Sequence, residues 1–240
     1  MPKFYGIDFE TYGDVDLPTY GRNRYMSSTN FKPLIVSVAG LRTFDFVLQP
    51  DAMNEFLGFL RKAVDEKETY LVAHNANFER GVMNTLLPLL KAKGIEEGAL
   101  RDIFIDSAVI ARQLGAASHL EAAAPQLTGR AKLEDGRRLI QLFSIPNEVN
   151  NWSAPTAELL ASDPSLMRDW QLFAEYCRGD AEAGELIAKL GYSMFQQGSF
   201  ANFWIEIDYE RLTARQNERG WQVDMNLVQA MQAQYEDNSS

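Results

Sequence analysis

Apolar residues occur along the chain in short runs separated by polar stretches, a pattern typical of strands that alternate with helices. Five of these runs predict strands, at residues 4–7, 34–40, 44–48, 70–73 and 103–105. A polar stretch up to Lys32 separates the first strand from the second. Strands that come first and then alternate with helices predict an α/β fold, in which a mixed sheet is flanked by helices.

Apolar residues at helical spacing predict the remaining elements. Helices are expected after Asp51 and at residues 78–91, 107–114, 121–143 with a break at Thr128–Gly129, 164–190 and 203–219. The helix from Pro164 has a strong start, because Asp163 can cap it and proline suits a first turn. Residues 144–164 carry three prolines and are interpreted as a long connection. Gly220 ends the helix over 203–219, and a last helix-like stretch follows.

The bulk composition allows one large domain, or one domain with a small appendage, because 46% of the 240 residues are hydrophobic. Cys177 is the single cysteine, which excludes an internal disulfide and a zinc site built from cysteines. The sequence has no signal-peptide pattern and no apolar stretch of about 20 residues that could span a membrane. We therefore expect a soluble protein without a membrane partner, in the cytoplasm, or in the host cytoplasm if the source is viral.

The net charge of -10 is the opposite of the basic balance expected of a protein that holds nucleic acid by phosphate contacts alone. It predicts weak binding to duplex DNA by this chain. Acids that bind metal ions change this expectation locally, because bound cations reverse the field that an incoming phosphate meets.

Asp8 and Glu10 form the first of three motifs whose acids suit a metal-dependent hydrolase. Side chains alternate along a strand, so both carboxylates point to one face at the end of the first strand, where one metal ion could bind both. With 33 acids in 240 residues, about four or five such pairs are expected by chance, so the pair alone is weak evidence.

The second and third motifs lie on predicted helices. Glu79 is near the start of the helix after the fourth strand, where the helix dipole also favours an acid. Tyr176 and Asp180 are four residues apart and share one face of the long helix, from which a hydroxyl and a carboxylate could address one water molecule. Taken singly, a buried tyrosine and an exposed acid explain the same pattern.

Histidine is too rare to build a metal site, because the chain has only His74 and His119. Any metal is therefore expected to be held by oxygen, which favours Mg²⁺ or Mn²⁺ over zinc. We interpret His74 as a hydrogen-bonded structural residue rather than a general base. The densest basic cluster is interpreted as a solvated helix face, with phosphate contact as the alternative. Its members are Arg130, Lys132, Arg137 and Arg138.

The order of the motifs resembles that of the proofreading 3′→5′ exonuclease domain of family A DNA polymerases, in the superfamily named for its Asp-Glu-Asp-Asp acids. Asp8-x-Glu10 is similar to the first exonuclease motif, Asn75-x-x-Phe78-Glu79 to the second, and Tyr176-x-x-x-Asp180 to the third, in the variant that has tyrosine instead of histidine. The surrounding segments resemble bacteriophage members: Ile7-Asp-Phe-Glu-Thr11, Ala73-His-Asn-Ala-Asn-Phe-Glu-Arg80 and Asp135-Gly-Arg-Arg-Leu-Ile-Gln-Leu-Phe-Ser144.

The resemblance implies a ribonuclease H-like exonuclease domain over residues 1–200, with a mixed five-stranded sheet. Residues 206–224 resemble the stretch that leads into a polymerase domain, so residues 201–240 are interpreted as the start of a connection to such a domain in a longer chain. The implied activity is metal-dependent removal of nucleoside monophosphates from single-stranded or frayed 3′ ends of DNA, as proofreading during replication.

The resemblance also implies roles for single residues. Asp8 would bridge two Mg²⁺ or Mn²⁺ ions, Glu10 and Asp180 would complete the first site, and Glu79 would support the second site through water. Tyr176 would orient the attacking water.

Thr11, Asn75 and Phe78 are the candidates for holding the terminal nucleotides, with Phe78 as a core residue in the alternative interpretation. Much of the superfamily has aspartate where this chain has Glu79. The extra methylene moves the carboxylate by roughly a bond length, which could weaken one metal site. We expect activity to survive, because in the family this acid acts on the waters of the second metal.

Two alternatives use the same residues differently. A free-standing exoribonuclease would share the chemistry, and hydrolysis of matched DNA and RNA oligomers separates the two, although the polymerase-like segment after Glu206 favours DNA. A catalytically silent domain that serves as a structural platform for a polymerase is the other alternative. The full set of acids argues against it, and an absence of metal-dependent turnover would support it.

Overall fold

The central sheet has five strands in the order β3-β2-β1-β4-β5. The computed structural model describes residues 2–129, 135–196, 203–220 and 222–239. The strands are β1 (Lys3–Tyr12), β2 (Lys32–Val38), β3 (Arg42–Asp45), β4 (Thr69–Ala73) and β5 (Phe104–Asp106). β1, β2 and β3 are antiparallel neighbours, whereas β4 runs parallel to β1 and β5 parallel to β4. This is a ribonuclease H-like arrangement, and the predicted α/β class with a mixed five-stranded sheet is confirmed.

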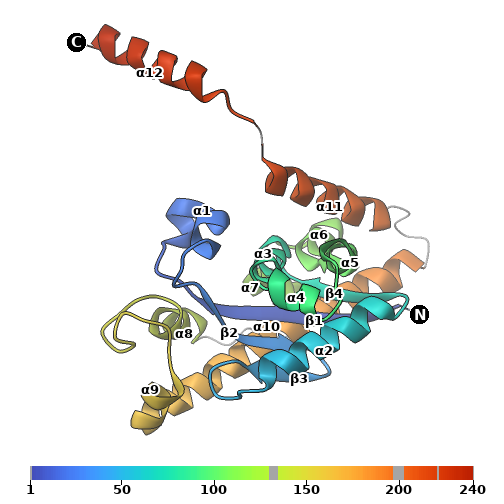
Figure 1. The fold of residues 1–240 in the computed structure, drawn as a ribbon. Helices are drawn as coiled ribbons and strands as arrows, with labels where there is room; N and C mark the ends of the chain where they lie inside the picture. Colours follow the sequence, from blue (N-terminus) through green and yellow to red (C-terminus); the bar gives the residue numbers. More distant parts are fainter. Residues whose placement is uncertain (1, 130–134, 197–202, 221, 240) are drawn as a thin grey trace.

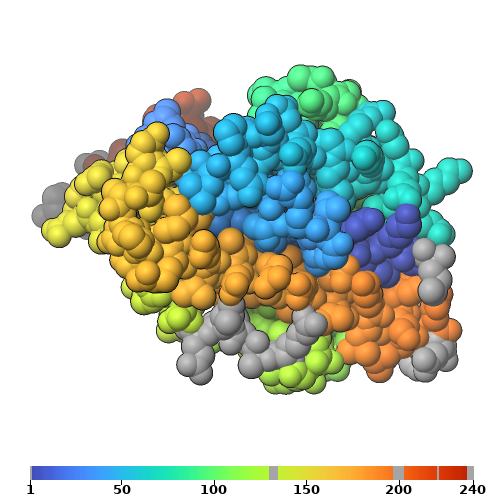
Figure 2. All heavy atoms as spheres, turned by 90° about the horizontal axis from the view of Figure 1, so that it is seen from below, coloured from blue at the N-terminus to red at the C-terminus, as the bar shows by residue number. Residues whose placement is uncertain are grey.

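Helices cover both faces of the sheet (Figure 1). On one face lie α2 (Ala52–Asp65), α3 (Asn77–Thr85), α4 (Leu87–Ala92) and α5 (Glu97–Ile103). The other face is covered along its length by the 33-residue helix α10 (Pro164–Gln196), which contacts β1, β2 and β4. Around α10 pack α6 (Ser107–Gln113), α7 (Leu120–Thr128), α8 (Gly136–Phe143) and α9 (Ala157–Ser162). Figure 2 shows α9 and α10 as a yellow-to-orange band across this face.

The two faces of β1 have different partners because side chains alternate along a strand. Ile7 and Phe9 enter the core on the side of α2, which uses its own row of apolar residues at helical spacing. Gly6 lies on the opposite side, where a Cβ atom would be 1.8 Å from the backbone oxygen of Ala181 in α10. Strand and helix are therefore in backbone contact, and the two acids of the first motif share the face that meets α10.

Several segments differ from the sequence-based expectation, among them α5, which covers a stretch where no helix was expected. The polar stretch before Lys32 contains α1 (Leu17–Met26), which buries a single side chain, Tyr25, and so lacks the apolar spacing of a surface helix. The helix expected over 78–91 is divided at Leu86, and Pro88 lies in the first turn of the second part. The expected long connection at 144–164 contains the short helix α9, which is capped by the Thr156 side chain.

The last two helices are α11 (Phe203–Arg219) and α12 (Met225–Ser239). The bounds of α11 agree with the sequence-based prediction, and Gly220 follows it with a positive φ of 66°. Phe203 and Ile207 of α11 are buried in the core beside α10, whereas α12 extends away from the sheet (Figure 1). Among the described helices, none combines the length and the apolar character needed to cross a bilayer.

Candidate active site

A cavity of about 310 Å³ opens at the carboxyl end of β1 and β4, where α3, α8 and α10 meet the sheet. Parallel strands present their carboxyl ends to the same edge, which is the usual position of ligand sites in α/β sheets. The eight residues that the sequence predicts for the site all line this cavity: Asp8, Glu10, Thr11, Asn75, Phe78, Glu79, Tyr176 and Asp180. Three motifs that are far apart in the sequence therefore share one cavity.

Asp8 and Glu10 form a compact ligand cluster with Cys177 of α10. Their potential ligand atoms all lie within 4.8 Å of one another, and the Cys177 thiol donates a hydrogen bond to the backbone oxygen of Asp8 at 3.2 Å. Burial, followed by the charges of Asp8 and Glu10, raises the pKa of the Cys177 thiol well above its usual value. The thiol therefore stays protonated, which leaves the two carboxylates as the ionic ligands. Glu79 and Asp180 line the same cavity outside this cluster of three.

Glu79 lies in the first turn of α3 with only 3% of its surface exposed. Its Oε2 atom is buried and has no hydrogen-bond partner among the residues that the structure describes. Burial, followed by the charge of Asp8, raises the pKa of Glu79 well above 4.5. A buried carboxylate with an unused oxygen beside another acid calls for a cation. Hard divalent cations, which prefer oxygen ligands, fit these residues.

Tyr176 and Asp180 lie one turn apart on α10, as the spacing predicts. Burial, followed by the charges of Asp180, Glu10 and Asp8, raises the pKa of Tyr176, so the phenol keeps its proton. The ring packs against Gly136 at the start of α8, where a Cβ atom would lie 2.3 Å from Cε2 of Tyr176. The glycine therefore lets α8 approach and hold the ring at the cavity wall.

Tyr25 of α1 forms another wall of the cavity and was not identified from the sequence, because α1 itself was not predicted. Its hydroxyl shares a hydrogen bond of 2.9 Å with Thr11 Oγ1, and burial raises its pKa to about 12. Its ring contacts Phe78, with centroids 6.3 Å apart. Phe78 is half-buried against the core while it lines the cavity, so the two interpretations of this residue are both compatible with its position.

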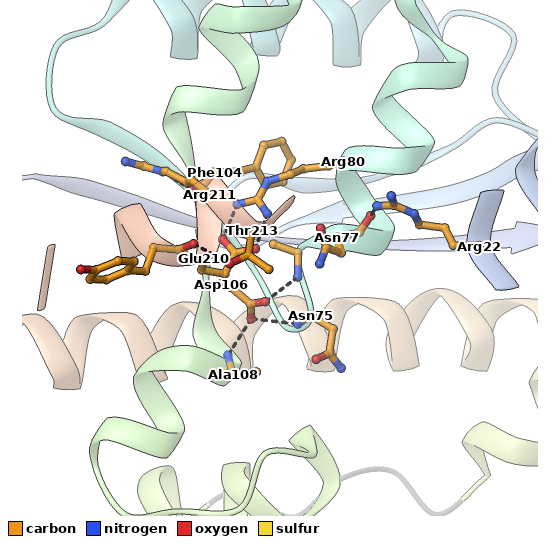
Figure 3. Close-up of polar contacts among 12 residues, drawn as sticks. Arg22, Asn75, Asn77, Arg80, Phe104, Asp106, Ala108, Glu210, Arg211 and Thr213 are labelled. Atoms are coloured by element: carbon orange, nitrogen blue, oxygen red, sulfur yellow. Dashed lines mark hydrogen bonds and ion pairs between the residues drawn. The ribbon is translucent and has the colours of Figure 1, made fainter. Parts of the chain in front are cut away.

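Asp106 holds the loop that carries the second motif, and sequence reasoning missed it (Figure 3). Its buried carboxylate accepts hydrogen bonds from the backbone N–H groups of Asn75 at 3.0 Å, Ala76 at 3.2 Å and Ala108 at 2.8 Å. Asn75 has a positive φ of 63°, a conformation that asparagine tolerates better than most residues. The available signal was an acid between a buried strand and a helix, which is typical of a helix cap.

His74 is confirmed as a hydrogen-bonded residue. Its Nδ1 atom lies 3.0 Å from Ser107 Oγ, and its Nε2 atom lies 2.8 Å from the backbone oxygen of Ser118. Both ring nitrogens thus have protein partners, which fix the ring at the edge of the cavity.

The basic cluster is described only in part, because Arg130 and Lys132 lie outside the described residues. Arg138 makes two hydrogen bonds to the carboxylate of Asp169 in α10, at 2.8 and 2.9 Å. This side chain therefore takes part in a surface ion pair between α8 and α10.

Fold and cavity define an α/β domain of the ribonuclease H-like type with acids gathered at the carboxyl edge of its sheet. No protein-family model matches the chain. A DNA polymerase of Bacillus phage SP02 is 27% identical over 232 residues, which are 94% of this chain and 33% of the polymerase. The chain thus spans about a third of the length of this relative. The chain is therefore similar to one part of a phage DNA polymerase.

Proposed function

We propose that this domain is a metal-dependent 3′→5′ exonuclease that removes nucleoside monophosphates from single-stranded or frayed 3′ ends of DNA. The observation that carries the proposal is the convergence of the three acidic motifs on one cavity. The relationship to a phage DNA polymerase supports a DNA substrate and a proofreading role beside a polymerase domain in a longer chain.

Asp8, Glu10, Glu79 and Asp180 would hold two Mg²⁺ or Mn²⁺ ions. Such ions activate a water molecule and stabilise the negative charge on the departing 3′ oxygen. The donor set supports this assignment, since all four ligands are carboxylates and the Cys177 thiol beside them stays protonated. The buried Oε2 atom of Glu79 has no hydrogen-bond partner among the described residues, so it could bind a cation directly or through a water molecule that the cation holds.

The remaining residues orient the reactants. Tyr176 keeps its proton and is fixed by packing, so its hydroxyl can donate a hydrogen bond to position the attacking water, but it cannot serve as a base at neutral pH. Thr11 and Asn75 offer polar groups to the terminal nucleotides, and Phe78 offers an aromatic ring that contacts Tyr25.

Removal of single carboxylates tests the proposal. Asp8→Ala and Asp180→Ala are each expected to abolish Mg²⁺-dependent digestion of a 5′-labelled single-stranded DNA, with the far-ultraviolet circular dichroism spectrum unchanged. Asp51→Ala is the matched control, because Asp51 is an exposed acid before α2 that makes no side-chain cap hydrogen bond and does not line the cavity. Digestion at the wild-type rate by either variant would refute the site assignment.

The same assay separates the alternatives. Faster digestion of a matched RNA oligomer would favour an exoribonuclease. A wild-type protein without any metal-dependent turnover would favour a silent structural domain.

A further inference from the structure

A buried ion pair joins the second motif to α11 (Figure 3). Arg80, which directly follows Glu79, makes two hydrogen bonds to the carboxylate of Glu210, and the Nη2–Oε2 distance is 2.7 Å. The side chains are 4% and 12% exposed, respectively. Two hydrogen bonds between a guanidinium group and a carboxylate fix the relative orientation of the two groups as well as their separation.

Further contacts anchor α11 to the sheet on both sides of this pair. Arg211 donates a hydrogen bond to the backbone oxygen of Phe104 at 3.1 Å, and Ile207 is fully buried. The guanidinium group of Arg80 lies over the ring of Phe104, 5.9 Å from its centroid. Glu210 is therefore presented to Arg80 from a helix whose position is itself fixed.

The start of α3 depends on such contacts because its own sequence does not cap it. The residue at its cap position, Ala76, has no side-chain hydrogen bond to offer. The carboxylate of Asp106 holds the N–H groups on one side, Arg22 of α1 donates to the backbone oxygen of Asn77, and Glu210 holds Arg80. These three contacts surround the turn that carries Glu79.

We propose that Glu210 is a positioning residue for Glu79, so that metal binding in the cavity depends on the docking of α11. This inference rests on the proposed function, since it assigns Glu79 to a metal site. A buried ion pair contributes little net stability compared with apolar packing, but its geometry is specific. Glu210 thus acts on the site through Arg80, without touching the substrate.

The test compares Glu210→Gln with Glu206→Gln in the intact protein. Glu206 is an exposed glutamate one turn earlier on the same helix, so its variant removes the same charge without breaking the pair. Mn²⁺ binding is titrated by the electron paramagnetic resonance signal of free Mn²⁺, and thermal unfolding is followed separately. Glu210→Gln is expected to weaken the second Mn²⁺ by about tenfold, as for loss of an outer-shell partner of a ligand. Glu206→Gln should bind like the wild type.

Kinetics supply a second readout. In Glu210→Gln the Mg²⁺ concentration for half-maximal digestion should rise by about tenfold, while KM for single-stranded DNA stays at the wild-type value. A lower melting temperature with unchanged Mn²⁺ affinity would reduce the pair to a purely structural role and overturn the inference. If Glu210→Gln does not fold, Glu210→Asp, which keeps the charge, must still bind Mn²⁺ more weakly than the wild type.

Failure of the proposed function has a different signature. A wild-type protein that binds no Mn²⁺ and digests no DNA would overturn the exonuclease assignment, and this inference with it. A wild-type protein that binds two Mn²⁺ ions and digests DNA, beside an indistinguishable Glu210→Gln variant, would overturn the positioning role alone.

Discussion

Asp106→Ala removes the acceptor of three backbone hydrogen bonds without touching the proposed metal ligands. Loss of the contact to Ala108 removes a helix cap, which costs about 1 kcal/mol. Ala76 is fully buried, so its N–H group would lose its partner without gaining water, at a cost of about 1–3 kcal/mol. A water molecule can replace Asp106 as the acceptor for the backbone N–H group of Asn75, because Asn75 is exposed.

Part of this loss is offset, because the carboxyl group is itself poorly solvated. Burial is the main cause that raises the pKa of Asp106, so its removal relieves a desolvation cost. We therefore expect Asp106→Ala to lower the free energy of unfolding by about 2 kcal/mol at neutral pH. Digestion of DNA should fall as well, since the loop of the second motif would lose its anchor.

Urea denaturation followed by circular dichroism measures the free energy, and amide hydrogen exchange at Ala76 reports on the loop itself. Asp51→Ala is again the control and should change stability by less than about 0.5 kcal/mol, as is usual for an exposed site. A loss below about 1 kcal/mol for Asp106→Ala, with unchanged exchange at Ala76, would refute the reasoning.

Three other predictions concern the cavity. Tyr176→Phe should slow digestion by about 100-fold, through poorer positioning of water, and a loss larger than that of Asp180→Ala would contradict its orienting role. Because burial raises the pKa of Glu79 and favours the neutral acid, the metal-free protein should lose stability as the pH rises from 4.5 through that pKa. Mn²⁺ affinity should increase over the same pH range, because the carboxylate must lose its proton to bind the ion. Flat pH profiles in both measurements would contradict this. Gly136→Ala should displace the Tyr176 ring and cost about 1–3 kcal/mol in urea denaturation, and an unchanged digestion rate would show that the ring is not fixed by α8.

The features that the sequence could predict are those determined by residues close together in the chain. Apolar runs indicated the strands, and Gly220 marked the end of α11 because glycine accepts a positive φ. The motif spacings put Tyr176 and Asp180 on one helical face, which the structure brings to the cavity.

Other features depend on tertiary packing and leave no local trace. Glu210 looks like any surface acid until its partner, 130 residues away, is known. Asp106 acts on a loop 30 residues earlier, and α1 is held by Tyr25 rather than by an apolar face of its own.

Gly6 affects the shape of the cavity, although it does not line the cavity itself. It lies two residues before Asp8, and its backbone touches that of Ala181, the residue after Asp180, so closely that a single methyl group would not fit. The close approach of β1, which carries the first motif, to α10, which carries the third, thus depends on the missing side chain of Gly6. Mutational surveys restricted to cavity-lining positions would overlook this residue. Any larger amino acid at this position would nevertheless push β1 and α10 apart.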